Sequence, residues 1–447
     1  MNSENPIISI VKRQKAGEHA GLFSCCSANE YVIRAVYRRC KEKGIPALIE
    51  ATANQVNQFG GYTGQTPEAF SLWCRELAKK EGFDEKSLIL GGDHLGPLTW
   101  TKLCESEAMA MADELIKAYV KAGFTKIHID TSMRLSSDDE RVALSDEVIA
   151  VRGARLCAAA EESYAERKKV IPDAEPPVYV IGSEVPIPGG SQETESLEVT
   201  SSESLRATIA AFRQAFEEKG LAGAWDRVSA VVVQPGVEFS EDDIFVYDRT
   251  KAKDLCMTIR EYPGLVFEGH STDYQPRRAL REMVSDGIAI LKVGPAFTFA
   301  LREALFALES IEKIIYQGQK EIRSNFSEVL EEAMLKNPVY WEKHYHGDEI
   351  KQRTNRAYGL SDRARYYLPD PLVSGAIARL IRNLKEPVPP ALLSQFMPIQ
   401  YFRVREGCLK NSAEDLIMDR IGDYIEDYIF AVEEIKEKTN KGDIECI

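Results

Sequence analysis

Eight short runs of apolar and β-branched residues, separated by longer amphipathic stretches, constrain the fold more than any other feature of this sequence. The runs are Phe23–Ser27, Ala47–Thr52, Leu88–His94, Lys126–Asp130, Val178–Glu184, Ala230–Gly236, Leu265–His270 and Ala289–Gly294. Continuous apolar strands that alternate with helices indicate a parallel sheet covered on its outer face. Eight such units within about 300 residues predict an α/β fold, a (β/α)8 TIM barrel, in preference to an open doubly wound sheet.

The stretches between the runs have the pattern of outer helices. In Ser204–Gly220, for example, four apolar residues recur at spacings of four, three and four residues, which places them on one helical face. After about residue 320 this alternation stops, and the remaining chain is helical in pattern and rich in aromatic residues. We therefore expect residues 8–320 to form the barrel and residues 321–447 to form a C-terminal helical appendage.

Charge and cysteine content indicate which classes of partner and which cellular compartment suit this chain. The 447 residues carry 56 Lys and Arg against 70 Asp and Glu, a net charge of −14, which disfavours nonspecific binding to nucleic acid or to an anionic membrane. The N-terminal residues have no apolar core of a secretion signal, and no apolar run is long enough to span a bilayer. The nine cysteines form no CxxC motif. These features predict a cytoplasmic protein with reduced thiols and with neither nucleic-acid nor membrane partners.

Polar side chains gather at the ends of the predicted strands, where barrel enzymes carry their catalytic groups. Random surface polarity would instead scatter such residues over both ends of the barrel. The pattern therefore predicts a polar site at the barrel mouth. Its candidate residues are Glu50, Asn54, Asp93, His94, Asp130, Glu184, Gln234, Glu238, Glu268, His270, Ser271 and Lys292.

Two of the six histidines, His94 and His270, fall at strand ends beside carboxylates. Imidazole and carboxylate ligands together suit a divalent cation that acts as a Lewis acid. We expect both histidines, with one or two of Glu184, Glu238 and Glu268, to bind Zn²⁺, Mn²⁺, Ni²⁺ or Co²⁺. The competing interpretation is that these groups only hydrogen-bond one another and water.

The remaining candidates are assigned to proton transfer and substrate binding. Asp93, next to one expected ligand, is expected to move a proton, with Asp130 or Glu184 as its counterpart. His128 is interpreted as a structural residue of the fourth strand. Substrate binding is assigned to the side chains of Glu50, Asn54, Gln234, Ser271 and Lys292.

Two further segments leave alternatives open. Lys292, with the hydroxyls of Ser271 and Thr272 and the backbone amides near Gly294, is expected to bind phosphate; the alternative is a structural pairing of Lys292 with a carboxylate such as Glu268. Residues 185–204, in which Val185 is followed by the sequence Pro-Ile-Pro-Gly-Gly, are expected to form either a mobile flap over the site or a plain surface loop.

Six long motifs in this order make the chain resemble the GatZ/KbaZ-like family, which is identified with the non-catalytic subunit of class II D-tagatose-1,6-bisphosphate aldolase. The resemblance covers essentially the whole chain. The motifs are EATANQVNQFGGYTG (50–64), GGDHLGP (91–97), HIDTSM (128–133), VQPGVEF (233–239), FEGHSTDYQ (267–275) and YGLSDRARYYLPDP (358–371).

The family in turn resembles the catalytic class II aldolases. Their pair of a proton-transfer aspartate and a zinc-binding histidine matches Asp93-His94, and the glutamate and Gly-Gly that follow their fifth strand match Glu184 and Gly189-Gly190. Their DGS element matches Asp130-Thr131-Ser132.

Other class II positions differ in this chain. The second zinc histidine falls on Val237, beside Glu238, and the third on Glu268, two residues before His270. The phosphate-binding Asn-x-Asp-Thr reads Gly294-Pro295-Ala296-Phe297. The resemblance therefore implies that the three-histidine zinc site and one phosphate cradle are lost.

Two functions from different classes follow. The first is an accessory, non-catalytic subunit that supports the catalytic tagatose-bisphosphate aldolase subunit in galactitol, N-acetylgalactosamine or tagatose catabolism. The second is a metal-dependent 4-epimerase that interconverts tagatose and fructose phosphates by breaking and re-forming the C3–C4 bond. The family resemblance favours the first, and the retained polar residues favour the second. The first function implies a catalytic aldolase subunit as the partner, and the second implies a ketohexose phosphate as the substrate. Whether the chain forms a homo-oligomer is left open.

Overall fold

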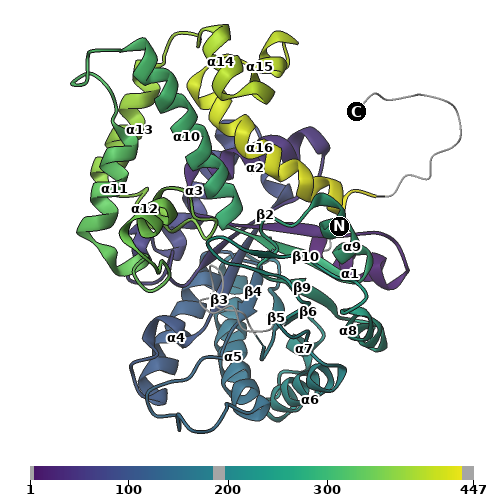
Figure 1. The fold of residues 1–447 in the computed structure, drawn as a ribbon. Helices are drawn as coiled ribbons and strands as arrows, with labels where there is room; N and C mark the ends of the chain where they lie inside the picture. The colour runs from purple at the N-terminus through teal and green to yellow at the C-terminus, as the bar shows by residue number, and fades with distance from the viewer. Residues whose placement is uncertain (1–4, 185–196, 435–447) are drawn as a thin grey trace, which may run out of the picture.

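The centre of the molecule is a closed barrel of eight parallel strands (Figure 1). The structure, a computed structural model, describes residues 5–184 and 197–434. Around the barrel the strands follow the order β1, β10, β9, β6, β5, β4, β3, β2. They are β1 (Leu22–Cys26), β2 (Ala47–Thr52), β3 (Leu88–Leu95), β4 (Lys126–Ile129), β5 (Val178–Ile181), β6 (Val228–Val233), β9 (Val266–Gly269) and β10 (Ile288–Val293). Each of the eight apolar runs supplies one strand, so the predicted (β/α)8 barrel is confirmed.

A ring of helices covers the outer face of the barrel, because each strand is followed by an amphipathic segment. The helix α2 shows how the sequence sets the ends: Asn29 accepts hydrogen bonds from the first free amides, and Gly44 ends the helix in the left-handed region. The ring consists of α2 (Glu30–Lys43), α3 (Pro67–Glu81), α4 (Glu105–Lys121), α5 (Asp146–Val170), α6 (Ser202–Glu218), α8 (Lys253–Thr258), α9 (Arg277–Ser285) and α10 (Pro295–Ile315), with the short α7 (Ala222–Trp225) after α6.

The two ends of the barrel differ in polarity. At the N-terminal end of the strands, α1 (Pro6–Lys15) buries Ile7, Ile10 and Val11 against apolar side chains of the barrel interior, such as Leu48 and Val232. At the opposite end the interior side chains are polar, and a small hairpin of β7 (Glu238–Phe239) and β8 (Ile244–Phe245) follows β6. The apolar end anchors the barrel and leaves the other end for a polar site.

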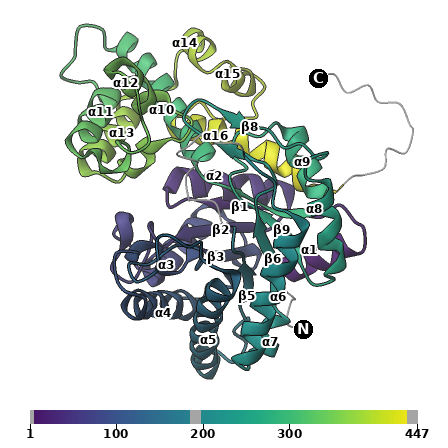
Figure 2. The same ribbon diagram turned by 60° about the horizontal axis from the view of Figure 1, so that its bottom comes forward.

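The chain after α10 is helical, as its pattern indicates, and it does not stand apart from the barrel. Figures 1 and 2 show α11, α12 and α13 together on one side, while α16 returns along the barrel beside α2. The helix α16 packs against α2, α9 and α10. These C-terminal helices are α11 (Phe326–Lys336), α12 (Glu349–Tyr358), α13 (Pro371–Asn383), α14 (Pro390–Phe396), α15 (Pro398–Arg405) and α16 (Ala413–Val432).

Polar contacts fix α16 to the barrel. Arg38 of α2 lies 2.6 Å from the Asp415 carboxylate, and Tyr428 donates its hydroxyl to the Thr272 carbonyl oxygen at 2.8 Å. The Tyr428 ring also contacts Phe23 of β1. The last helix therefore completes the helical shell next to the strand ends. No helix in the described part of the chain is both long and apolar enough to cross a membrane.

Candidate active site

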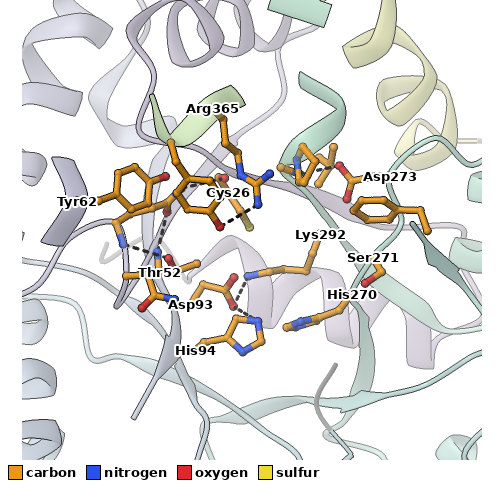
Figure 3. A pocket seen from close by; sticks show the side chains of 17 residues that line it. Cys26, Thr52, Tyr62, Asp93, His94, His270, Ser271, Asp273, Lys292 and Arg365 are labelled. Carbon is orange, nitrogen blue, oxygen red and sulfur yellow. Dashed lines mark hydrogen bonds and ion pairs between the residues drawn. The ribbon is translucent and has the colours of Figure 1, made fainter. Parts of the chain in front are cut away.

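A cavity opens at the C-terminal ends of the strands (Figure 3). Its empty volume is about 650 Å³, including the open mouth. Strand ends supply Asp93, His94, His270 and Lys292 to its wall, and the C-terminal part of the chain supplies Arg365 and Tyr366. The cavity thus lies where the polar strand ends predict a site.

Three imidazoles and one carboxylate surround one point beside this cavity. Asp93, His94, His128 and His270 are all buried, and each offers one ligand atom within 4.8 Å of those of the others. The ring centroids lie 4.9 Å apart for His94 and His270, 5.0 Å for His94 and His128, and 5.1 Å for His128 and His270. The structure therefore assembles three histidines. The resemblance to class II aldolases indicates only two of them: His94, which matches a zinc ligand, and His270, which lies two residues after another.

His128 is the member of this group that sequence reasoning assigned to a structural role. Its side chain belongs to the barrel interior, because side chains of a strand alternate between its two faces. Ile127 and Ile129 belong to the apolar core cluster outside the barrel, so Lys126 and His128 face inward. This alternation within the fourth strand is the signal that could have found both residues.

A carboxylate orients His94. The Nδ1 atom of His94 lies 2.8 Å from Asp130 Oδ2, and Asp130 also accepts hydrogen bonds from the amide and hydroxyl of Ser132. Burial alone would raise the pKa of Asp130, but the contacts with His94 and Ser132 lower it to about 2. Such a carboxylate–histidine pair fixes the ring of a metal ligand and leaves Nε2 available. Asp130 therefore lies where it can orient the His94 ring. The backbone of His94 itself lies in the left-handed region (φ 48°).

His128 and His270 complete a set that fits a divalent cation. His128 Nδ1 lies 2.9 Å from Asp93 Oδ1, while its buried Nε2 has no hydrogen-bond partner among the described residues. Burial lowers the pKa of His128, and it lowers that of His270 to about 3, so both rings are neutral, as metal ligation requires. Buried polar atoms without partners are rare in proteins, and a cation would satisfy this one. The donor set of imidazoles and a carboxylate suits Zn²⁺, Mn²⁺, Ni²⁺ or Co²⁺.

A buried layer of lysines and glutamates lies next to the histidines. Lys126 Nζ is 2.7 Å from Glu50 Oε1 and 2.6 Å from Glu268 Oε2. Lys292 Nζ is 2.6 Å from Glu50 Oε2 and 2.7 Å from Asp93 Oδ1. Burial alone would lower the pKa of Lys292, but these carboxylates hold it well above its ordinary value. Glu50, Glu268 and Lys292 therefore lie together, and Lys292 is paired with carboxylates.

Two of the predicted residues lie apart from this centre. Glu184 is exposed and accepts a hydrogen bond from the Thr200 hydroxyl. Gln234 accepts hydrogen bonds from the amides of Gly236 and Val237 and so stabilises a turn. Neither residue lines the cavity. Most of the predicted flap, residues 185–196, lies outside the described residues.

Asn54 and Ser271 line the cavity, as expected for substrate-binding residues, and Asn54 is exposed to it. Glu238 lies outside the group of three histidines and contacts the Ser271 side chain and the Phe239 amide instead. Burial raises the pKa of Glu238 to about 7. A group with this pKa exchanges protons near neutral pH.

The backbone amides expected to bind phosphate already have an internal partner. Asp273 Oδ1 accepts hydrogen bonds from the amides of Gly294 (3.1 Å) and Ala296 (2.8 Å) at the start of α10. The Thr272 hydroxyl donates to the carbonyl oxygen of Lys292 at 2.6 Å. Of the hydroxyls predicted to bind phosphate, that of Ser271 lines the cavity, and its internal partner is Glu238.

The fold and the site define a class: a (β/α)8 barrel protein with a buried histidine–carboxylate centre at the C-terminal ends of its strands. The chain belongs to the family described as D-tagatose-1,6-bisphosphate aldolase subunit GatZ/KbaZ-like, whose model matches residues 7–433. It is thus related to tagatose-bisphosphate aldolase.

Solved structures similar to this chain were also found. A protein from Sinorhizobium meliloti 1021, described as a probable tagatose 6 phosphate kinase, is 44% identical, with a TM-score of 0.83 over 92% of this chain and 100% of that one. The YdjI aldolase from Escherichia coli K12 is 11% identical (TM-score 0.38; 80% and 93% covered). A fructose-bisphosphate aldolase from Campylobacter jejuni is 14% identical (TM-score 0.41; 85% and 91% covered). The two aldolases are too distant to support any statement about this site.

The raised pKa of Glu238 predicts a pH-dependent stability. In the unfolded chain this carboxyl ionises near its ordinary pKa of 4.5, whereas in the folded protein it stays protonated up to about pH 7. Its contribution to the free energy of unfolding is therefore complete below pH 4.5 and is lost as the pH rises to 7, by about 3 kcal/mol. Glu238→Gln should be more stable relative to wild type at pH 8 than at pH 5.

Urea unfolding of both proteins at the two pH values measures this difference. Asp243→Asn, an exposed change in the same hairpin, is the matched control and should show no pH-dependent gain. An equal effect of Glu238→Gln at both pH values would contradict the raised pKa.

Proposed function

We propose that this protein is a divalent-metal-dependent enzyme that epimerises ketohexose phosphates at C4, interconverting tagatose and fructose phosphates. The observation that carries the proposal is the group of Asp93, His94, His128 and His270, in which the buried His128 Nε2 lacks a partner within the described chain. These four residues would hold the cation. When bound, the cation would polarise the oxygens of the sugar and stabilise negative charge that develops on them.

The residues around the cavity fit the breaking and re-forming of the C3–C4 bond. Cleavage requires removal of the proton from the C4 hydroxyl. The aldehyde then rotates so that its other face meets the enediolate, and the proton returns when the bond re-forms. Glu238, which contacts the cavity residue Ser271, holds or releases a proton near neutral pH. The ammonium group of Lys292, fixed by Glu50 and Asp93, supplies positive charge at the cavity wall.

Exposure of the sugar to water would let the two fragments escape, so the cavity must retain both. Its lining includes Tyr62, Arg365 and Tyr366 in addition to the strand ends. A cavity walled by both parts of the chain would favour recombination of the two fragments over their release.

Epimerisation can be tested directly. Protein stripped with EDTA and reconstituted with Zn²⁺, Mn²⁺, Ni²⁺ or Co²⁺ is incubated with D-fructose 6-phosphate, and the products are separated by chromatography. We expect D-tagatose 6-phosphate with at least one cation and none in EDTA. A protein that retains no stoichiometric metal, and forms no epimer of the mono- or bisphosphate with any cation, would rule the proposal out.

A second candidate is the accessory, non-catalytic subunit, which the family description favours. In this role the chain would bind a catalytic tagatose-bisphosphate aldolase subunit and raise its stability and activity. The two roles differ in their dependence on the histidines. If the chain is only accessory, a His94→Ala/His128→Ala variant should activate the purified catalytic subunit as well as wild type does.

A further inference from the structure

The turn Arg363–Tyr366 after α12 places a guanidinium group at the cavity formed by the barrel. Arg365 and Tyr366 of this turn line the same cavity as Asp93 and His270, although they lie far from the barrel strands in the sequence (Figure 3). The barrel mouth is therefore completed by a C-terminal segment, residues 359–366.

The hydrogen bonds of Arg365 all go to neutral oxygens. Its Nη1 donates to the carbonyl oxygens of Ser361 (2.5 Å) and Asp362 (2.9 Å), and its Nη2 donates to the Tyr366 hydroxyl (3.0 Å). The structure, over residues 5–184 and 197–434, gives this guanidinium no ion pair with a carboxylate. By contrast, Lys126 and Lys292 are both paired with carboxylates.

Two N–H groups of Arg365 remain for a ligand. A guanidinium has five N–H donors, and the contacts above use both on Nη1 and one on Nη2. The Nε–H and the second Nη2–H have no acceptor among the residues that the structure describes. A guanidinium edge with two such donors matches two oxygens of a phosphoryl group.

The electrostatic surroundings favour an anion at this place. Burial alone would raise the pKa of the Tyr366 phenol, but Arg365 and Arg363 lower it below its ordinary value. The potential around this hydroxyl is therefore positive. At the same cavity, the amides at the start of α10 already bind the Asp273 carboxylate, so they leave the phosphoryl group of a ligand to another donor.

The segment that carries Arg365 is held rigidly against the barrel. Asp362 lies in the left-handed region (φ 44°), and its carboxylate is 2.8 Å from the buried Arg302 Nε of α10. The Thr298 hydroxyl donates to the same carboxylate, and the Tyr274 hydroxyl donates to the Leu360 carbonyl oxygen. A cation fixed in this way loses little freedom when it binds a ligand.

We propose that Arg365, together with the Tyr366 hydroxyl, binds the phosphoryl group of the sugar phosphate at the cavity. The inference takes its substrate class from the proposed function, but it concerns binding and does not require turnover. It assigns substrate recognition to the C-terminal helical part of the chain, whereas the histidines and lysines come from the barrel.

Binding of D-fructose 6-phosphate, D-fructose and inorganic phosphate to the full-length, metal-free protein tests the proposal by calorimetry. Arg365→Met should weaken the binding of D-fructose 6-phosphate and of inorganic phosphate by about ten-fold or more, while Arg365→Lys should recover part of the affinity. The affinity for D-fructose should be unchanged. Arg379→Met, which removes an exposed arginine on α13, is the matched control and should bind all three like wild type.

Two results would overturn the proposal: Arg365→Met binding inorganic phosphate as tightly as wild type, or wild type binding D-fructose 6-phosphate no more tightly than D-fructose. Thermal unfolding of each variant shows whether a loss reflects a failure to fold, and in that case Arg365→Lys decides. If phosphate binding depends on Arg365 but no cation supports epimerisation, the proposed function fails and the phosphoryl site stands.

Discussion

His128→Ala should weaken divalent-cation binding by at least about 100-fold and abolish epimerisation, because it removes one of three imidazoles from the proposed centre. Wild type in Mn²⁺ at 100 times its dissociation constant should gain about 2.7 kcal/mol in the free energy of unfolding. The variant should gain almost nothing at that concentration. Metal content by mass spectrometry and urea unfolding with and without Mn²⁺ measure both effects.

Two further variants make this test sharper. His346→Ala, an exposed histidine in the C-terminal part of the chain, should retain wild-type metal content. Asp130→Asn should leave all three imidazoles in place but weaken cation binding by roughly 10–100-fold, because Asp130 orients the His94 ring. Metal content that is the same in His128→Ala and wild type would exclude His128 from the site.

Lys126→Met should destabilise the protein by about 3–5 kcal/mol, which is a large part of the stability of an ordinary domain. Lys126 is fully buried between Glu50 and Glu268, so its loss leaves two buried carboxylates with less compensation. The free energy of unfolding, measured in urea at pH 7, gives the effect. Lys169→Met, an exposed change on α5, should alter stability by less than about 0.5 kcal/mol.

A double variant separates charge pairing from packing. Lys126→Met/Glu268→Gln should be more stable than the sum of the two single changes predicts, because the second change removes a carboxylate that the first left unpaired. Strict additivity would mean that the Lys126–Glu268 pair contributes nothing beyond the packing of its side chains.

The barrel could be predicted from the sequence because its strands carry the information locally. The strand Val228–Val233 is buried on both faces, and its apolar composition shows this without reference to any other segment. The position of Glu50, Asp93 and His270 at one end also followed, since the carboxyl ends of parallel strands meet at one end of a barrel.

The partners within the site depend on side-chain direction and on distant segments, which the runs alone do not show. The apolar pattern of the fourth strand suggests only a structural role for His128 and gives Lys126 no role, because it does not show which side chains face the barrel interior. The Asp273 carboxylate accepts a hydrogen bond from the Gly294 amide, a contact that only the closed fold brings about. Arg365 lies outside the barrel, and its motif, YGLSDRARYYLPDP, was the only hint that this segment serves the site.

The return of α16 to the barrel has a consequence for the order in which the molecule can form during synthesis. Arg38 and Asp415 form an ion pair across 377 positions of the chain, and α16 covers α2. Until the ribosome has released residues near 432, the face of α2 that meets α16 has no cover. Because α16 also buries Leu416, Ile421 and Ile425 in the apolar core, the nascent barrel emerges without the cover of these side chains. A premature stop before Ala413 should therefore yield an aggregation-prone chain despite a complete set of eight strands.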